Sequence, residues 1–309
     1  MKLMVLDGNS VINRAYYGVR ALTTKDGFFT NAIYGFLNIL EKLRTEEQPD
    51  ALCVTFDLKA PTFRHLAYDG YKATRHPMPD ELAMQLPMMK DILRAMRIPI
   101  FECEGWEADD VIGTLSQKGV EAGYEVFMVT PDKDYGQLVR DNCKIYKQKG
   151  AEGSIEIVDR EAIRGKYGID DPSLVRDILA LWGDASDNIP GVPGIGEKTA
   201  MALVQEYGSI DTLYAQMPDV HAKPAALRKL QEGEESARHS YWLATIVTDA
   251  PLEFRPEDNL RQPFKPELYD LFLRLEFQKL IDKYGLSPQH QPEEKADAAA
   301  EVKIGRAHV

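Results

Sequence analysis

Apolar residues form three short, nearly continuous runs along the first half of the chain, and acidic residues follow each run. Unbroken apolar runs of this length are typical of strands that are buried on both faces of a parallel sheet. The runs cover Leu3–Leu6, Ala51–Phe56 and Val126–Thr130. The acids that follow them are Asp7, Asp57, Asp132 and Asp134.

Between the runs the apolar spacing changes to a helical period. Apolar residues recur every three or four positions in 31–44 and in 107–118, which predicts an amphipathic helix in each range. A chain that alternates strands and helices in this way favours an α/β fold with a mostly parallel central sheet flanked by helices. Ligands bind such sheets beyond the carboxyl ends of the strands, which is where the aspartates are expected.

The strand pattern fades at about residue 170, and the rest of the chain is predicted to be mostly helical. Helices are expected at 173–182, with Ser173 as the N-cap, and at 197–207, on either side of the glycine- and proline-rich loop Gly191–Gly196. We therefore expect an α/β core at 1–168, a helical region at 169–285, and a polar, disordered linker or tail at 286–309.

Composition narrows the class of protein. The 309 residues are 44% hydrophobic, which supports one large domain or two modest ones. No apolar stretch is long enough for a membrane helix or a signal-peptide core, so we expect a cytoplasmic protein with no membrane partner. Three scattered cysteines are typical of reduced thiols. The net charge of −12 by itself argues against a nucleic-acid ligand, but a site for several divalent cations must also concentrate carboxylates.

Two further groups of acids extend the set: Glu107, Asp109 and Asp110 at a predicted helix start, and Asp184 and Asp187 before the glycine-rich loop. Each group alone fits ordinary helix capping or a turn. If all of these carboxylates met at one sheet edge, they would repel one another and take up protons. Hard divalent cations such as Mg²⁺ relieve that repulsion, and two of them about 4 Å apart can drive phosphoryl displacement. Zinc is not expected, because no cysteine or histidine cluster accompanies the acids.

Six short motifs occur along the chain in a distinctive order. They are Leu6–Ser10, Phe56-Asp57 with Thr62–His65, Tyr71-Lys72 with Arg75, Glu107–Asp110, Asp132–Leu138 and Gly183–Gly191. In this order and spacing, over roughly residues 1–285, they resemble the flap-endonuclease family of 5′-3′ exonucleases, and within it the 5′-nuclease domains of bacterial DNA polymerases. The resemblance implies a PIN-like, Rossmann-like nuclease core, a helical arch at about 71–100, and a helix-hairpin-helix-like element at about 174–207.

The resemblance also implies a chemistry: divalent-metal-dependent hydrolysis of phosphodiester bonds near 5′ ends or flaps of DNA, with two Mg²⁺ or Mn²⁺ ions. One ion would be held mainly by residues matching Asp7, Asp57, Glu107 and Asp109. The other would be associated with Asp110, Asp132, Asp134, Asp184 and Asp187. Lys72 and Arg75 match basic residues near the scissile phosphate, where they would offset developing charge. Taken alone, they also fit a solvated turn.

The same resemblance implies a site that binds the backbone of duplex DNA. Glycines let the chain approach a phosphate closely, and helix N-termini attract anions. The residues concerned are Gly191, Gly194, Ile195, Gly196, Lys198 and Thr199. The family's loop often holds a monovalent ion such as K⁺, and a simple helix–helix turn is the alternative. Tyr16 is a candidate either to stack on a base or to pack against the core, and Arg64 is a candidate contact to the DNA backbone.

Expected partners are DNA with a 5′ flap, a nick or a 5′ single-stranded end, bound by a monomer. Residues 304–309 resemble a translated sequencing adapter, so we expect the natural chain to be longer and to carry a polymerase domain in cis. Two alternatives stay open. One is a PIN-type ribonuclease, which shares an acidic α/β site, and the other is a non-catalytic, structure-specific DNA-binding module.

Overall fold

The computed structural model describes residues 1–149, 154–217 and 219–288 of the chain. Most of the tail expected at 286–309 therefore lies outside the described residues. The chain divides into two compact units, Met1–Phe264 and Lys265–Val309. The second unit contributes two described helices, α13 (Glu267–Arg274) and α14 (Gln278–Tyr284).

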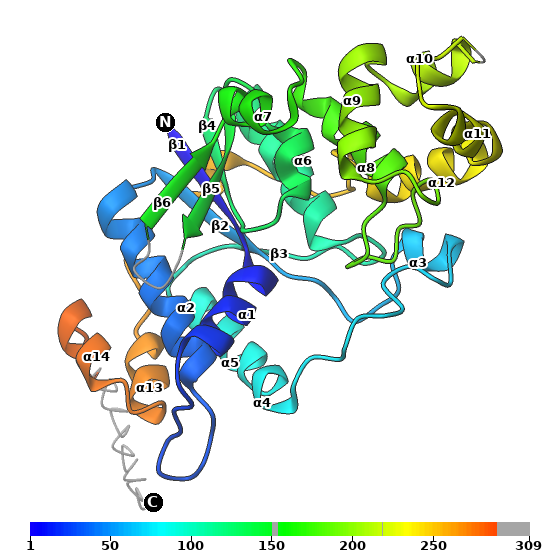
Figure 1. The fold of residues 1–309 in the computed structure, drawn as a ribbon. Coiled ribbons are helices and arrows are strands. Elements are labelled where there is room, and N and C mark those ends of the chain that lie inside the picture. Colours follow the sequence, from blue (N-terminus) through cyan, green and yellow to red (C-terminus); the bar gives the residue numbers. More distant parts are fainter. Residues whose placement is uncertain (150–153, 218, 289–309) are drawn as a thin grey trace, which may run out of the picture. The chain divides into compact units, whose positions relative to one another are not determined.

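A single six-stranded sheet organises the first unit, with the strand order β3-β2-β1-β4-β5-β6 (Figure 1). The pairs β2–β3, β1–β2, β1–β4 and β4–β5 are parallel, and only β6 runs antiparallel to its neighbour. The strands are β1 (Lys2–Asp7), β2 (Ala51–Thr55), β3 (Ile100–Phe101), β4 (Glu125–Val129), β5 (Cys143–Lys149) and β6 (Ser154–Val158). The predicted α/β fold with a mostly parallel sheet is confirmed.

Helices connect the strands and cover the sheet. They are α1 (Gly8–Gly18), α2 (Asn31–Lys42), α3 (Phe63–Ala67), α4 (Asp80–Ala83), α5 (Gln85–Ala95), α6 (Ala108–Glu121) and α7 (Arg160–Tyr167). A short π-helix, η1 (Leu43–Glu47), and a 3₁₀ helix, η2 (Asp134–Leu138), accompany them. In Figure 1, α6 lies on one side of the sheet and α1 and α2 lie on the other. Leu3 and Val5 of β1 share one buried cluster with Val111, Ile112 and Leu115 of α6.

Helices dominate the chain after α7, as the sequence predicted. They are η3 (Pro172–Leu174), α8 (Val175–Trp182), α9 (Glu197–Tyr207), α10 (Ile210–Ala215), α11 (Pro224–Glu232), α12 (Glu234–Ala244) and η4 (Pro256–Asn259). The prediction that Ser173 is an N-cap is wrong. Asp171 caps instead, because its carboxylate accepts the Ser173 backbone N–H at 2.9 Å and Pro172 begins a separate 3₁₀ turn.

The segment in which we expect an arch consists of an exposed stretch around Arg75–Pro77 followed by α4 and α5. Leu82, Met89 and Leu93 are fully buried, so both helices bury an apolar face. Gln85 is also fully buried, and its Oε1 accepts the backbone N–H groups of Ala32 and Ile33 at 2.9 and 3.2 Å. It thereby caps α2 from a distance, since Thr30 makes no side-chain cap there.

The described residues contain no helix that is long and apolar enough to span a membrane. Their three cysteines are free thiols, and Cys53 and Cys143 are buried.

One buried carboxyl outside the acidic site makes the stability of the fold depend on pH. Asp177 is 2% exposed and accepts the backbone N–H of Ile210 at 2.9 Å, which ties α8 to α10. Burial raises its pKa from 3.8 to about 6, although that hydrogen bond and Arg176 act in the opposite direction. Because the folded-state pKa lies above the unfolded one, the stabilising contribution is complete below about pH 4 and is lost as the pH rises through about 6.

We therefore expect Asp177→Asn, which stays neutral and keeps the acceptor oxygen, to flatten this pH dependence. Its unfolding free energy should exceed that of the wild type by roughly 2 kcal/mol at pH 7 and match it near pH 4, measured by urea unfolding. The control is Asp91→Asn, because Asp91 lies on the exposed face of α5 in a solvated ion pair with Arg94. Equal curves for the wild type and Asp177→Asn across this pH range would contradict the assignment.

Candidate active site

Asp7 begins the site at the carboxyl end of β1, where it pairs in register with Thr55 of β2. It also caps α1, because its Oδ1 accepts the Ser10 N–H at 2.9 Å, and its Oδ2 accepts the Thr130 hydroxyl at 3.0 Å. The residue is only 4% exposed. Burial raises its pKa more than these hydrogen bonds lower it, and the nearby charge of Asp57 adds to the rise.

Asp57 follows β2 and, unlike Asp7, is exposed. Its Oδ1 accepts the backbone N–H of Ala108 at 2.7 Å, and the Asn9 amide donates to its Oδ2. Asp57 therefore joins the end of β2 to the first residue of α6. A carboxylate at a helix N-terminus is stabilised there by the unpaired amides and the helix dipole.

A buried arginine neutralises two of the acids at the start of α6. Arg64 is 2% exposed, and its guanidinium donates to Glu107 at 2.8 Å and to both oxygens of Asp110 at 2.7 and 2.8 Å. The guanidinium also donates to the backbone carbonyls of Leu243 and Thr245. Burial alone would lower the Arg64 pKa, but the bonds to Asp110 and Glu107 outweigh it and the pKa is raised.

Asp110 lies at the helix start where the sequence placed it, but its ion pair with Arg64 was not predicted. Asp110 is fully buried, and its carboxylate also accepts backbone N–H groups from Glu107 and Val247. Its predicted role as a metal ligand, and the predicted contact of Arg64 with DNA, would both require this buried pair to open. In the structure the two residues form a buried ion pair, which Glu107 also joins.

Lys72 lies between the carboxylates of Glu107 and Asp187. Its ammonium donates to Oε1 of Glu107 at 2.5 Å and lies 3.5 Å from Oδ2 of Asp187. Burial raises the Glu107 pKa, but Lys72 and Arg64 outweigh it, so the net pKa is lowered. Arg75 forms an ion pair with the other oxygen of Asp187, and its side chain is half exposed at 52%. The two predicted catalytic cations thus lie together at the acids.

The backbone around Lys72 is held in an unusual conformation. Its φ of +54° is in the left-handed region, which a residue with a side chain rarely adopts. The Lys72 N–H donates to the Asp187 carbonyl at 2.9 Å, and the Asn188 amide donates to the Gly70 carbonyl at 2.7 Å. These two bonds fasten the turn that carries Lys72 to the loop that carries Asp187.

Asp109 and Asp134 occupy the part of the site where acids outnumber bases. Burial, followed by repulsion from Asp7, Glu107 and Asp132, raises the Asp109 pKa well above its usual range despite the attraction of Lys72. Burial, followed by repulsion from Asp132 and Asp184, raises the Asp134 pKa to about 8. Oδ1 of Asp134 is buried and has no hydrogen-bond partner among the described residues.

Asp184 closes the site from the helical region. Lys133 lies 3.2 Å from its Oδ2, and the Ser186 N–H donates to its Oδ1 at 2.7 Å. Although burial raises its pKa, these contacts outweigh that effect and the net pKa is lowered. Gly183 precedes it with a φ of +83°, and a Cβ there would meet the Ile189 carbonyl oxygen at 2.5 Å, so only glycine fits.

The carboxylates of the site suit hard divalent cations, but the described side chains are not arranged as a complete ion site. Among the residues that the structure describes, no three acidic, histidine or cysteine groups are already arranged to hold an ion. The free groups are carboxylate oxygens, the ligands that Mg²⁺ prefers. The unpartnered oxygen of Asp134 and the raised pKa of Asp109 identify carboxyl groups whose ionised forms lack compensation, which a bound cation would supply.

The predicted DNA-binding residues of the helical region lie in the loop Gly191–Gly196 and in the first turn of α9. Gly191 and Gly194 have φ values of +61° and +81°, and Gly196 is the N-cap of α9. A Cβ on Gly191 would lie 2.4 Å from the Gly183 backbone nitrogen, so the loop packs directly against the loop of Asp184. Ile195 is buried, whereas Lys198 and Thr199 are exposed in the first turn of α9.

Tyr16 belongs to a different element, α1, which begins immediately after Asp7. It is partly exposed and packs edge-on against the exposed ring of Tyr17, with 4.9 Å between ring centroids.

Sequence reasoning missed several residues that shape the acids. The Tyr71 hydroxyl donates to Glu107 at 2.9 Å, the Tyr135 hydroxyl donates to Asp109 and the Thr130 hydroxyl donates to Asp7. Tyr71 belongs to one of the six motifs, Tyr135 lies within the range of another, and Thr130 ends the third apolar run. That proximity was the available signal, because a hydroxyl beside a predicted carboxylate is its natural donor.

Two family profiles match the chain. The profile described as "5'-3' exonuclease, N-terminal resolvase-like domain" matches residues 2–168, and the one described as "5'-3' exonuclease, C-terminal SAM fold" matches residues 170–267. Among solved structures, the phage T5 D15 protein co-crystallised with metal ions aligns with a TM-score of 0.65 at 20% identity, over 92% of this chain and 97% of that one. The catalytic core of Rad2 in complex with DNA substrate aligns with a TM-score of 0.57 at 18% identity, over 92% and 90%.

Full-length relatives agree with the profiles. DNA polymerase I of Caldicellulosiruptor bescii is 42% identical over 290 residues, which cover 93% of this chain and 34% of that protein. The thermostable DNA polymerase I of Thermus thermophilus is 38% identical over 296 residues, covering 96% and 34%. The chain thus spans about a third of the length of the curated relatives it matches. The resemblance inferred from the six motifs is confirmed, and the chain belongs to the 5′-3′ exonuclease family.

Proposed function

We propose that this chain is a divalent-metal-dependent, structure-selective nuclease that hydrolyses phosphodiester bonds near the 5′ end or flap of DNA. The observation that carries the proposal is the charge arrangement at the carboxyl edge of the sheet. Asp109, whose pKa is raised well above its usual range, lies near the cations Lys72 and Arg75, and Asp134, whose pKa is raised to about 8, lies near Lys133. Such a site can attract both divalent metal and phosphate. The names of two structural neighbours, one with metal ions and one with a DNA substrate, support this choice.

In this proposal the chain's own residues position the phosphodiester and balance charge. Two divalent ions, held by Asp7, Asp109, Asp132 and their neighbours, would supply Lewis acidity and make water acidic enough to attack near neutral pH. A phosphate entering the site would compete with Glu107 and Asp187 for the Lys72 ammonium. Arg75, which is half exposed, would meet the phosphate first. Both cations would then offset the charge that develops in the transition state.

The DNA would also bind at a second site, around Gly191–Gly196. The exposed Lys198 and the free N–H groups at the start of α9 suit a DNA backbone phosphate, and carbonyls of the loop could hold a monovalent cation such as K⁺. Because the loop packs on Gly183, a duplex held there would be fixed relative to Asp184 and the other acids. We further propose that the protein acts as a monomer and that a polymerase domain works in cis in a longer natural chain.

The metal requirement is tested by cleavage of a 5′-end-labelled DNA flap with Mg²⁺ and with EDTA. We expect a discrete product with Mg²⁺, none with EDTA, and a loss of at least about 10³-fold in kcat for Asp132→Ala, because the displacement depends on the ions. Asp91→Ala is the matched control, since Asp91 is an exposed carboxylate on α5 away from the acids. Binding of the flap without cleavage under any divalent ion would favour the non-catalytic DNA-binding module instead.

The roles of the two cationic regions are separable by kinetics. Lys72→Met should lower kcat by roughly 10²-fold with little change in KM, because its charge is used in the transition state. Lys198→Ala should mainly raise KM and reduce the salt dependence of binding by about one counterion, because it contacts only the DNA backbone. Steady-state kinetics over a salt series measures both. If Lys72→Met changes only KM, Lys72 is a binding residue rather than a catalytic one.

A further inference from the structure

The four carboxylates that the family resemblance assigns to one metal ion differ in how their oxygens are engaged. Among the described residues, Asp7, Asp57 and Glu107 each have a hydrogen-bond donor on both oxygens. Asp109 has a donor on Oδ1 only, the Tyr135 hydroxyl at 2.5 Å, and no described residue donates to its Oδ2. Oδ2 of Asp109 is therefore available to a cation without the loss of a hydrogen bond.

The Tyr135 hydroxyl has a fixed position. Tyr135 is fully buried in η2, and it belongs to the main hydrophobic cluster. Gln137 of the same 3₁₀ helix is tied to the segment at the end of α12, because its amide donates to the Ala244 carbonyl at 2.9 Å and its Oε1 accepts the Ile246 N–H at 2.9 Å. Packing and hydrogen bonds thus hold η2 in place, so the hydroxyl presents a stationary donor to Asp109.

The hydrogen bond from Tyr135 also joins two segments that carry acids of the site. Asp109 lies in the first turn of α6, whereas Tyr135 follows Asp134 directly in η2. Oδ1 of Asp134 is buried and, like Oδ2 of Asp109, has no donor among the described residues. The bond therefore links two segments that each present a carboxylate oxygen without a donor.

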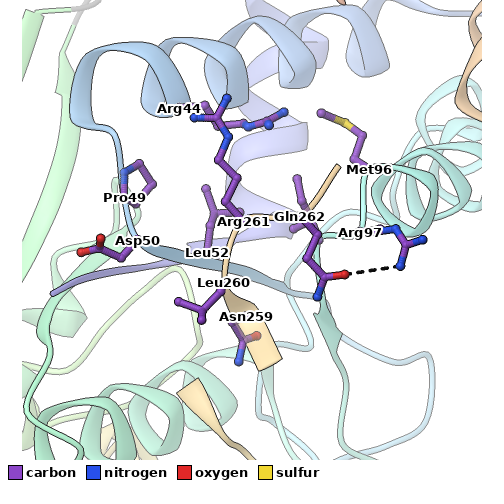
Figure 2. Close-up of a pocket in the computed structure, with 11 residues that line it drawn as sticks. Arg44, Pro49, Asp50, Leu52, Met96, Arg97, Asn259, Leu260, Arg261 and Gln262 are labelled. Carbon is purple, nitrogen blue, oxygen red and sulfur yellow. Dashed lines mark hydrogen bonds between the residues drawn. The ribbon is translucent and has the colours of Figure 1, made fainter. Parts of the chain in front are cut away.

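Polar side chains at the opposite end of the sheet are not organised around one group. Figure 2 shows the pocket at the start of β2, where Arg97 donates to Oε1 of Gln262 at 3.3 Å. Arg44 also lines this pocket, and its guanidinium lies over the ring of Phe264, 4.6 Å from the centroid. These side chains contact separate partners, whereas the donors at the carboxyl end of the sheet serve one group of acids.

We propose that Tyr135 is a positioning residue for divalent-cation binding, which holds Oδ1 of Asp109 and leaves Oδ2 for the cation. The proposal rests on the metal-dependent nuclease function proposed above. It adds a residue that acts through Asp109 and does not touch DNA, because Tyr135 is fully buried. Without the hydroxyl, the Asp109 carboxylate would lose its donor and turn more freely. A cation would then have to fix the carboxylate as it binds, which weakens binding.

Isothermal titration of the 309-residue chain with Mn²⁺, without DNA, tests the proposal. Tyr135→Phe removes only the hydroxyl, and we expect it to weaken Mn²⁺ binding by roughly tenfold, as the loss of a partner that orients a metal ligand usually does. Tyr146→Phe is the matched control. Tyr146 is also buried, at 1% exposure, and its hydroxyl donates to Glu47, a carboxylate outside the site, at 3.2 Å. This control should bind Mn²⁺ as tightly as the wild type.

Flap cleavage over a series of Mn²⁺ concentrations gives a second readout. For Tyr135→Phe, the Mn²⁺ concentration at half-maximal rate should rise by about the same tenfold factor, while kcat at saturating Mn²⁺ stays within about threefold of the wild type. A defect confined to folding would instead lower the melting temperature in EDTA and the rate at every Mn²⁺ concentration, without moving that midpoint.

The outcomes separate the role of Tyr135 from the nuclease function. If the wild type binds Mn²⁺ and cuts the flap while Tyr135→Phe binds Mn²⁺ within about twofold of it, the positioning role is wrong and the nuclease function stands. Equal weakening by Tyr135→Phe and Tyr146→Phe would also overturn the role, because the effect would not depend on Asp109. If the wild type neither binds Mn²⁺ nor cuts the flap, the nuclease function fails and the role of Tyr135 fails with it.

Discussion

The buried ion pair between Arg64 and the two acids Glu107 and Asp110 is the interaction on which the rest of the site depends. Carboxylates can be buried at the start of α6 only if a cation and hydrogen bonds compensate them. Arg64 supplies both, and its remaining donors reach the carbonyls of Leu243, in the last turn of α12, and of Thr245, its C-cap. One side chain thereby ties α3 and α6 of the α/β core to the helical region. Removing it would leave uncompensated charge in the interior and free the two halves of the site.

The basic side chains at the sheet edge are unevenly shared among the acids, so some carboxylates are well compensated and others are not. Glu107 and Asp184 lie beside Lys72, Arg64 or Lys133, and their pKa values are lowered. Asp109 and Asp134 have too little compensation, and their pKa values are raised. Burial is the main cause of both raised pKa values and repulsion from neighbouring carboxylates adds to it, so a bound cation would favour the ionised forms. The fold therefore compensates Glu107 and Asp184 with its own cations and leaves Asp109 and Asp134 less compensated.

How much of this the sequence could predict follows from which residues carry strong local signals. The acids that follow the three apolar runs were placed correctly at the carboxyl ends of strands, because unbroken apolar runs identify buried parallel strands. Strand β5 was not predicted, because lysines interrupt its apolar pattern. Polar residues are common near the edge of a sheet, and only the edge strand β6 lies beyond β5. Arg64 was predicted to contact the DNA backbone, and its burial in the interior was not predicted. Its burial depends on contacts more than 100 residues away, at Leu243, that no local pattern reveals.

The same reasoning explains why the net charge is a poor guide to this protein's ligands. The strands of the sheet run in parallel, so groups that precede them collect at one edge and groups that follow them collect at the other. Acids follow β1, β2 and β4, while Arg44, Arg97 and Arg261 surround the starts of β2 and β3. Several acids thus gather at one edge of the sheet. The opposite edge keeps a local positive charge that the sum over the whole chain conceals.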